Sequence, residues 1–392
     1  MGLHLIGDLG TFGGGVAGYI VPFLFVLTVV VFFHELGHFL VARWCGIKVM
    51  AFSIGFGPEI VGFNDRYGTR WKIAAVPLGG YVKFFGDDNA ASAPDTAAAA
   101  AMTDTEKKVS FVHQPVASRA AVVAAGPFAN FVLAIFIFAG IFLIVGKQTT
   151  SARVDAVQPG SAAATAGFKP GDLVLSIDGD RIDSFADMQR IVSVSAGDHL
   201  SIVVDRGGEH VTIDAVPQLK ELKDSFGNAQ RIGVLGISRS MAKGDIKTEK
   251  VGPIKALGLG AQKTWFVVQR TLYYIGGVFT GKESADQLGG PIRIAQVSGE
   301  VASAGFTALI DLTAVLSISI GLLNLFPIPL LDGGHLLFYG IEAVRGRPLH
   351  ERTLEVGFRL GLVLVLLLMG FAMRNDLCQW SWFARFGVCS GS

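Results

Sequence analysis

Apolar runs dominate the chain, and four of them are long enough to cross a lipid bilayer. A membrane-spanning helix needs about 20 apolar residues, and runs of this kind lie within residues 1–45, 116–147, 306–341 and 354–374. The third run is interrupted by two prolines and a Gly-Gly pair. Such irregular backbone is tolerated at membrane depth where it is buried in protein or lines a wet cavity. The pattern therefore predicts a polytopic α-helical membrane protein with four transmembrane helices.

Three stretches between these runs have other patterns. Residues 46–86 contain short strand-like runs separated by glycines, which predicts β-hairpins. Residues 87–115 begin with a stretch rich in Ala, Asp and Thr, and we expect a mobile cytoplasmic loop there. Residues 250–305 carry basic residues at helical spacing among aromatic ones, which favours interfacial amphipathic helices over a further span.

Residues 151–240 differ from the rest of the chain. They carry more charge, alternate between apolar and polar positions and contain frequent turns, which predicts a small α+β domain with a helix at 185–194. The stretch resembles a PDZ domain of the bacterial type, with Pro159-Gly-Ser161, Ala166 to Asp172 and Ile177-Asp-Gly179 where that family has them. PDZ domains accept an extended peptide along a sheet edge. A spacer that only limits access sterically fits the same pattern.

The composition excludes several classes of protein. Of the 392 residues, 51% are hydrophobic and 17% are charged, which excludes a disordered chain and an ordinary soluble enzyme. The formal net charge of +1 gives no indication of nucleic acid binding. The three cysteines are too few for a disulfide framework. Cys378 and Cys389 could pair if the C-terminal tail faces an oxidising compartment.

Basic residues set the expected orientation in the membrane. Lysines and arginines are frequent between the first two helices, from Arg43 to Arg119, and arginines also follow the third run. By the positive-inside rule these segments are cytoplasmic. We therefore expect the N-terminus, the PDZ-like domain and a tail at 375–392 to lie on the outer side of the membrane. In a Gram-negative cell this side is the periplasm, and the membrane is the bacterial inner membrane.

A His-Glu-x-x-His motif, His34-Glu35-Leu36-Gly37-His38, lies inside the first apolar run. On a helix, positions i and i+4 share one face, so His34 and His38 can bind the same ion. Glu35 can then act as a base toward a water molecule beside that ion. Ionisable side chains in a membrane span are costly unless they face a polar site or an ion. The motif therefore indicates an intramembrane zinc site near the cytoplasmic side.

The zinc site needs a further ligand, because a catalytic zinc normally has three protein ligands. Asp332, an acidic residue in the broken third span, is the best candidate. His335 is an alternative, although a carboxylate completes the commoner ligand set. Asn324 can hydrogen-bond a substrate backbone or form a purely structural hydrogen bond. For Asn130, in the second span, we expect a hydrogen bond between helices.

Several of these motifs together resemble a site-2 protease, and more closely the bacterial RseP-type regulated intramembrane zinc metalloproteases. They are the His34–His38 motif, the segment Asn324 to Gly334, Gly126-Pro-Phe-Ala-Asn130 and the PDZ-like domain. The resemblance implies that Zn²⁺ is bound by His34, His38 and Asp332. It also implies that Glu35 is the general base and that Asn324 helps to hold the substrate. The best-known enterobacterial relatives carry two PDZ domains in tandem, whereas only one is recognisable here.

The resemblance also implies the substrate class and the partners. We expect cleavage within the transmembrane segment of a single-span membrane protein whose periplasmic part was trimmed first, such as an anti-sigma factor or a remnant signal peptide. The hairpins of 46–86 would form a membrane-associated element that pairs with the unwound substrate. The PDZ-like domain either binds a new peptide C-terminus or only blocks bulky, uncut substrates. The main alternative is a catalytically inactive zinc-containing scaffold. A zinc transporter fits less well, because carriers usually show repeated halves.

Overall fold

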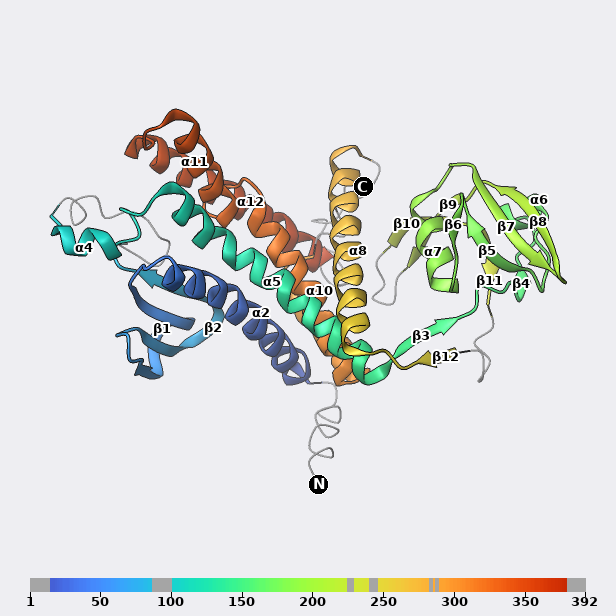
Figure 1. The fold of residues 1–392 in the computed structure, drawn as a ribbon, viewed down its shortest axis with the longest axis horizontal. Helices are drawn as coiled ribbons and strands as arrows, with labels where there is room; N and C mark the ends of the chain where they lie inside the picture. Colours follow the sequence, from blue (N-terminus) through green and yellow to red (C-terminus); the bar gives the residue numbers. More distant parts are fainter. Residues whose placement is uncertain are drawn as a thin grey trace, which may run out of the picture. The chain divides into compact units, whose positions relative to one another are not determined.

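The computed structural model describes residues 15–86, 101–223, 229–239, 246–281, 285 and 289–378 (Figure 1). The chain divides into two compact units. Residues up to 140 together with those from 257 onward form the first unit, and residues 141–256 form the second. Residues 87–100 of the expected loop and the end of the expected tail, with Cys389, lie outside the described residues.

Four long apolar helices form the framework of the chain. They are α2 (Val16–Trp44), α5 (Val116–Val145), α10 (Phe306–Leu325) and α12 (Glu351–Cys378), and all four contain a stretch long and apolar enough to cross a membrane. The predicted fold class is confirmed: the chain is a helical membrane protein with a β-hairpin element and an inserted α+β domain.

The third predicted span, 306–341, is not one continuous helix. α10 ends at Leu325, and α11 (Asp332–Arg345) begins after a short break that contains Pro327 and Pro329. Proline lacks the backbone N–H of a helix and clashes with the preceding turn, so these residues end α10. A Cβ on Gly333 would lie 2.2 Å from the carbonyl oxygen of Phe326, so the turn back into α11 requires glycine. Asp332 therefore begins a new helix.

Small residues let these helices approach closely. A Cβ on Gly37 of α2 would lie 2.3 Å from the carbonyl oxygen of Ala125 in α5. α10 meets α5 at Gly321, where a Cβ would lie 3.1 Å from the carbonyl oxygen of Pro127. Membrane helices associate through contacts of this kind, because lipid provides no hydrophobic drive between them. α5 is thus packed tightly against both α2 and α10.

Two further helices, α8 (Pro253–Phe279) and α9 (Pro291–Ser303), occupy the segment predicted to hold interfacial helices. α8 contacts α5, since a Cβ on Gly260 would lie 2.5 Å from the carbonyl oxygen of Ile135. Lys263 of α8 also forms an ion pair with Asp311 of α10 at 2.5 Å. α8 is therefore bound to the framework helices, and its place relative to the membrane stays a prediction.

α9 is held by the C-terminal helix. The buried carboxylate of Asp376, in the last turn of α12, accepts hydrogen bonds from the backbone N–H groups of Gly290 and Arg293 at 2.8 and 3.0 Å. An acidic group at this position satisfies the free N–H groups at the start of a helix. α12 thereby fixes the beginning of α9.

One long antiparallel hairpin, β1 (Val49–Asn64) and β2 (Arg70–Phe84), follows α2. Phe52 pairs with both Val82 and Trp71, and Trp71 pairs in turn with Phe63. The two strands therefore supply four paired segments, in the order 80–84, 49–54, 70–73 and 61–64. The outer pairs run antiparallel, whereas 51–54 and 70–73 rise together along the register and so run parallel. The sequence predicted several short hairpins, whereas the structure folds a single hairpin over on itself.

Arg43 joins this sheet to α2. Its guanidinium lies 4.6 Å from the ring centre of Phe39 and 4.3 Å from that of Tyr67. It also donates a hydrogen bond to the Asp65 carboxylate at 2.5 Å. Cation–π contacts and an ion pair of this kind reinforce one another where water is partly excluded. The sheet is thus fixed near the end of α2 that carries His38.

A short helix, α4 (Asp104–Val109), lies within the stretch predicted as a loop at 87–115. Its start is a capping box: the Thr103 hydroxyl accepts from the Glu106 backbone, and the Glu106 carboxylate accepts from the Thr103 backbone. Thr-x-x-Glu is a recognised helix-start pattern. The prediction of a loop was wrong for these six helical residues.

The second unit is an α+β domain at the place predicted for the PDZ-like domain. Its main sheet has the order β6 (Asp180–Arg181), β5 (Leu173–Ile177), β7 (Leu200–Arg206) and β8 (Glu209–Ala215). Its helices are α6 (Ala162–Ala166) and α7 (Phe185–Val194), and α7 coincides with the helix predicted at 185–194. Two smaller ladders pair β4 (Ala156–Val157) with β11 (Ile237–Ser238) and β9 (Gln218–Lys223) with β10 (Ala229–Val234).

The chain enters and leaves this unit through one two-stranded ladder. β3 (Lys147–Thr150) pairs antiparallel with β12 (Ile246–Glu249), and Thr150 lies opposite Ile246. The domain core lies beyond this ladder and contains fully buried side chains such as Val154, Ile177 and Ile202. The domain is therefore a self-contained insertion between α5 and α8.

Asp172 is a buried charge in this domain. Its side chain is 1% exposed, and its two carboxylate oxygens accept hydrogen bonds from Arg206 at 2.7 Å. These hydrogen bonds lower the pKa of Asp172 below its ordinary value. The stability that the ionised carboxylate provides is therefore present above about pH 4 and is lost as the pH falls through the lowered pKa.

Asp172→Asn is expected to destabilise the domain by about 2 kcal/mol at pH 7, because Arg206 loses its charged partner. Hydrogen exchange of the β7 amides in the full-length protein should then be about 30-fold faster, and this difference should shrink below about pH 4. Asp183→Asn, which removes an exposed pair with Arg181, serves as control and should leave exchange unchanged. Equal exchange in Asp172→Asn and the wild type at pH 7 would contradict the role of this pair.

Candidate metal centre

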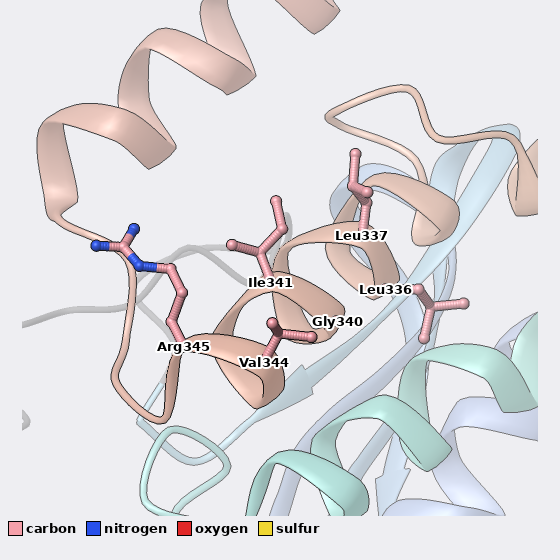
Figure 2. A pocket seen from close by; sticks show the side chains of 6 residues that line it. All are labelled: Leu336, Leu337, Gly340, Ile341, Val344 and Arg345. Atoms are coloured by element: carbon pink, nitrogen blue, oxygen red, sulfur yellow. The ribbon is translucent and has the colours of Figure 1, made fainter.

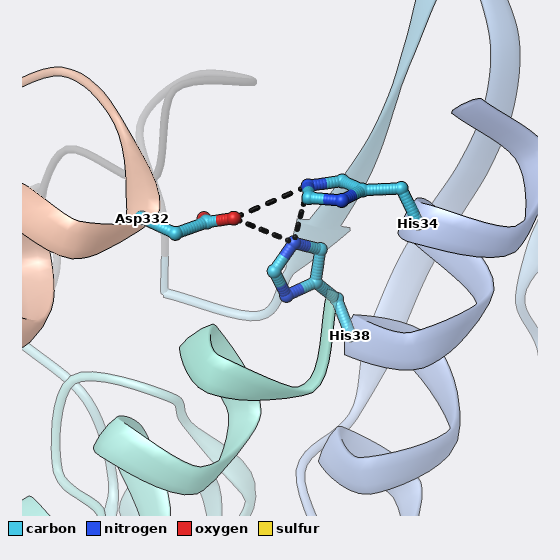
Figure 3. Close-up of side chains that lie close together, drawn as sticks. All are labelled: His34, His38 and Asp332. Atoms are coloured by element: carbon cyan, nitrogen blue, oxygen red, sulfur yellow. Dashed lines mark hydrogen bonds and ion pairs between the residues drawn. The ribbon is translucent and has the colours of Figure 1, made fainter. Parts of the chain in front are cut away.

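Three predicted site residues from distant parts of the chain lie together (Figure 3). His34 and His38 project from successive turns of α2, and their Nε2 atoms are 3.3 Å apart. The Oδ2 atom of Asp332, at the start of α11, lies 3.2 Å from the Nε2 of His34 and 3.6 Å from that of His38. The three side chains thus direct their ligand atoms at one point between α2 and α11.

The donor set fits a divalent cation. The Oδ2 atom of Asp332 is buried and makes no hydrogen bond, although two imidazole nitrogens face it. A buried carboxylate oxygen in this state calls for a positively charged partner. Two imidazoles and one carboxylate are a ligand set of catalytic zinc sites, which keep the fourth position open for water or substrate. The arrangement therefore suits zinc in a catalytic rather than a closed structural site.

The ring of His38 is oriented by α5. Its Nδ1 lies 2.8 Å from the carbonyl oxygen of Val122, which can only accept a hydrogen bond, so Nδ1 carries the proton. The lone pair is then on Nε2, which faces the cluster. A Cβ on Gly126 would lie 2.3 Å from this same Nε2 atom. α5 thus fixes the His38 tautomer and leaves the space that the ring needs.

Asp332 owes its place to the packing of α11. Gly334 lies so close to the preceding break that a Cβ would be 2.4 Å from the Ile328 carbonyl oxygen. Further along α11, Glu342 forms a mostly buried ion pair with Arg119 of α5 at 2.7 Å. The Arg119 guanidinium also lies 4.9 Å from the ring centre of Tyr339. These contacts hold α11 against α5, and thereby hold its first residue near α2.

Glu35 lies between the two histidines on α2 and beside the sheet. The backbone of Val82 hydrogen-bonds to its carboxylate, and a Cβ on Gly80 would lie 3.1 Å from its Cγ. Both residues belong to the segment 80–84, which is an outer segment of the folded hairpin. A carboxylate next to the ligand cluster and next to the outer segment of the sheet can act on a peptide bound along that segment.

The structure places the other two candidates differently. Asn324 is half-buried in the last turn of α10, before the break that leads to Asp332, and its role toward a substrate stays a prediction. The ring of His335 lies 5.3 Å from that of Phe358 in α12 and 6.4 Å from that of Tyr339. His335 is not part of the cluster found among the described residues, so the geometry favours Asp332 over His335 as the third ligand.

A shallow apolar groove of about 450 Å³ follows α11 beyond Asp332 (Figure 2). It begins one turn after Asp332 and ends at Arg345, which is its only charged residue. Leu337, Ile341 and Val344 along it are exposed. The surface of α11 that follows Asp332 is therefore apolar.

Two contributions of α5 escaped the sequence analysis. The Val122 carbonyl is a backbone group, so no residue type marks it. Gly126 was part of the motif that carried the family resemblance, yet its contact with His38 needs the relative rotation of two helices. The regular spacing of Val122, Gly126 and Asn130, four residues apart on one helix face, was the available signal.

Comparisons with known proteins point in the same direction as this geometry. The family described as "Peptidase family M50" matches residues 22–368. A relative in Agrobacterium fabrum, whose name contains the words zinc metalloprotease, is 50% identical and covers 93% of this chain and 97% of its own. "Metalloprotease MmpA" of Caulobacter vibrioides is 40% identical and covers 94% of this chain and 97% of its own.

A solved structure matches part of the chain. It is the PDZ domain of an SdrC-like protein from Listeria monocytogenes, which is 24% identical over 22% of this chain and 83% of its own, with a TM-score of 0.18.

Gly126→Ala is expected to weaken zinc binding by about tenfold or more, because the added methyl group displaces the Nε2 atom of His38. Alanine favours a helix more than glycine does, so the substitution should not impair folding of α5 itself. The measurement is zinc affinity of the purified full-length protein. Gly140→Ala is the matched control, because a Cβ there meets open space on the same helix. Equal affinity in both variants would contradict the packing of His38 against α5.

Proposed function

The chain belongs to peptidase family M50, the site-2 protease family, and from this membership we propose that it cuts single-span membrane proteins within their transmembrane segments. As a member it is an intramembrane zinc metalloprotease rather than the inactive scaffold that the sequence alone left open. The proposal adds a substrate whose periplasmic part has already been trimmed, such as an anti-sigma factor or a remnant signal peptide. It also adds an inner-membrane orientation with both termini and the inserted domain in the periplasm.

The convergence of His34, His38 and Asp332 is the observation that carries this proposal. His34 and His38 belong to α2, which is long and apolar enough to cross a membrane, and Asp332 follows the break after another such helix, α10. Ionisable side chains within a membrane cost much free energy, so a cluster of them there indicates a functional site. We propose these three residues as the zinc ligands.

Glu35 is the proposed general base. When bound, zinc supplies Lewis-acid chemistry that polarises a carbonyl group and makes water more acidic. Glu35 adjoins a ligand on α2, so its carboxylate can take a proton from the attacking water and later deliver it to the leaving amine. Asn324 is the proposed residue that holds the substrate, through a hydrogen bond from its side-chain amide to a backbone carbonyl oxygen.

The folded hairpin provides a place for the substrate. A peptide bond in a helix is hydrogen-bonded and shielded, so the substrate must unwind before it is cut. The outer segment 80–84 can replace the lost hydrogen bonds by pairing with an extended peptide. The Val82 N–H points outward to Glu35, and because strand N–H groups alternate, that of Gly80 points the same way. A peptide paired there would lie beside Glu35.

We further propose that the inserted PDZ-like domain controls which substrates reach the site. Its connection through the β3–β12 ladder makes it separable from the helices that carry the ligands. A domain that blocks bulky, untrimmed substrates would explain why trimming comes first. A groove that docks the new C-terminus of a trimmed substrate is the other mode in which it could act.

Glu35→Gln is expected to keep zinc but to lower the rate of cleavage of a single-span substrate by about 10²–10⁴-fold, because the amide cannot accept a proton. His34→Ala and Asp332→Ala should lose both zinc and cleavage. The assay uses purified protein in detergent with zinc quantified in each sample. Glu355→Gln, which removes an exposed pair with Arg359 on α12, is the matched control and should behave as the wild type. Wild-type turnover by Glu35→Gln would refute its assignment as the base.

Removal of the inserted domain tests its role in substrate selection. Residues 151–245 can be replaced by Asn-Gly, because Thr150 and Ile246 already lie opposite each other and Asn-Gly suits a tight hairpin turn. If the domain is a steric gate, the variant should cut untrimmed substrate faster and trimmed substrate at the wild-type rate. Slower cleavage of trimmed substrate would indicate docking instead. Unchanged cleavage of both substrates would rule out any control by this domain.

A further inference from the structure

Asn130 is a buried amide in the apolar helix α5. Such a group is costly to bury unless it is hydrogen-bonded. We expected a hydrogen bond between helices at this position, and the structure contains one: the side-chain nitrogen of Asn130 lies 3.2 Å from the Nδ1 atom of His34 on α2. The side chain of Asn130 thus contacts one of the three proposed zinc ligands.

The two polar atoms of this amide differ in their surroundings. The nitrogen faces His34, whereas the Oδ1 atom is buried and has no hydrogen-bond partner. The backbone carbonyl of Asn130 is satisfied separately, by the Ser317 hydroxyl of α10 at 2.9 Å. An orphaned buried oxygen in a native site calls for a physical explanation.

The protonation of a zinc-binding histidine supplies that explanation. An imidazole that binds zinc through Nε2 carries its proton on Nδ1 and must donate it to an acceptor. His38 meets this requirement through the Val122 carbonyl oxygen. The Nδ1 atom of His34 faces an amide nitrogen, which also donates, so this orientation suits only the opposite tautomer. That tautomer directs its Nε2 proton toward Asp332, 3.2 Å away.

A half-turn of the amide resolves the conflict. The oxygen and nitrogen of an asparagine amide occupy nearly the same volume, so rotation exchanges them without new space. Oδ1 then accepts the Nδ1 proton of His34 and is no longer orphaned, and the lone pair of His34 is on Nε2, toward the cluster. After the rotation the amide nitrogen, instead of the oxygen, lacks a partner. The benefit of the rotation is therefore the tautomer of His34 that can bind zinc through Nε2.

We propose that Asn130 is a positioning residue that sets the tautomer of His34, with its side-chain oxygen accepting the Nδ1 proton in the zinc-loaded protein. The inference rests on the proposed ligand set, not on the proposed substrate. One face of α5 would then orient both histidines of α2 on the side away from the cluster. This face carries Val122, Gly126 and Asn130. A zinc ligand commonly needs such an outer hydrogen bond to fix its tautomer and orientation.

The test compares an apolar variant with one that keeps an acceptor oxygen. Asn130→Leu removes both polar atoms, Asn130→Asp keeps an acceptor, and Ser317→Ala removes only the neighbouring bond to the Asn130 backbone. Zinc affinity of the full-length protein, prepared without a histidine tag, is measured by competition with a chromophoric chelator. The visible spectrum of the cobalt-substituted protein reports the coordination geometry.

Asn130→Leu should bind zinc about 10- to 100-fold more weakly and alter the cobalt spectrum. Asn130→Asp and Ser317→Ala should stay close to the wild type. Wild-type affinity in Asn130→Leu would overturn the inference, and so would an Asn130→Asp variant as weak as Asn130→Leu, because an acceptor oxygen would then not matter. A wild type that binds no zinc would instead overturn the proposed ligand set and this inference with it.

A second measurement needs no variant, and therefore holds even if Asn130→Leu does not fold. In the zinc-loaded wild type labelled with ¹⁵N-histidine, magnetic resonance distinguishes protonated from unprotonated ring nitrogens. The inference requires that Nδ1 of His34 carries the proton. An unprotonated Nδ1 on His34 would overturn it.

Discussion

Three ionisable side chains have to be held together where water is scarce, and much of the first unit serves that requirement. His34, His38 and Asp332 would each be costly alone among apolar helices, but together they present two imidazole nitrogens and a carboxylate oxygen to one point. Two of them are preset by the pitch of α2. Asp332 lies far from the two histidines in the sequence, so its position beside them depends on how α5, α10 and α11 pack.

The need to bring Asp332 to the two histidines explains where the helices are broken and where they contact one another. The proline-rich break after α10 lets Asp332 open a new helix instead of continuing the old one. Gly37 brings α5 within reach of α2, and Gly126 then leaves room for the His38 ring. Arg119 and Glu342 hold α11 to the same helix. α5 carries none of the proposed ligands, yet it contacts every element that does, which makes it the scaffold of the centre.

The sequence allowed the ligand set to be predicted because its signals are local. Two histidines four residues apart and a carboxylate in a broken apolar run can be recognised without a partner. Pairings between distant residues could not be predicted in the same way. In the folded hairpin, Phe52 pairs with a residue on each side. The apolar and polar positions of one strand do not show whether it will pair on one side or on both. The contact of Asn130 with His34 depends on the rotation of α5 about its axis. Thr103 and Glu106 mark the start of α4 locally, but the alanine-rich stretch before them is typical of a loop and favours the wrong structure there.

The most direct test of the centre is X-ray absorption at the zinc edge of the purified full-length protein. The account predicts one zinc ion with nitrogen and oxygen ligands only, at about 2.0–2.1 Å, of which two are imidazoles. Two imidazoles with a carboxylate and a water or substrate oxygen would agree with His34, His38 and Asp332. A third imidazole would replace Asp332 by His335, a sulfur ligand at about 2.3 Å would implicate a cysteine, and either result would contradict the centre described above.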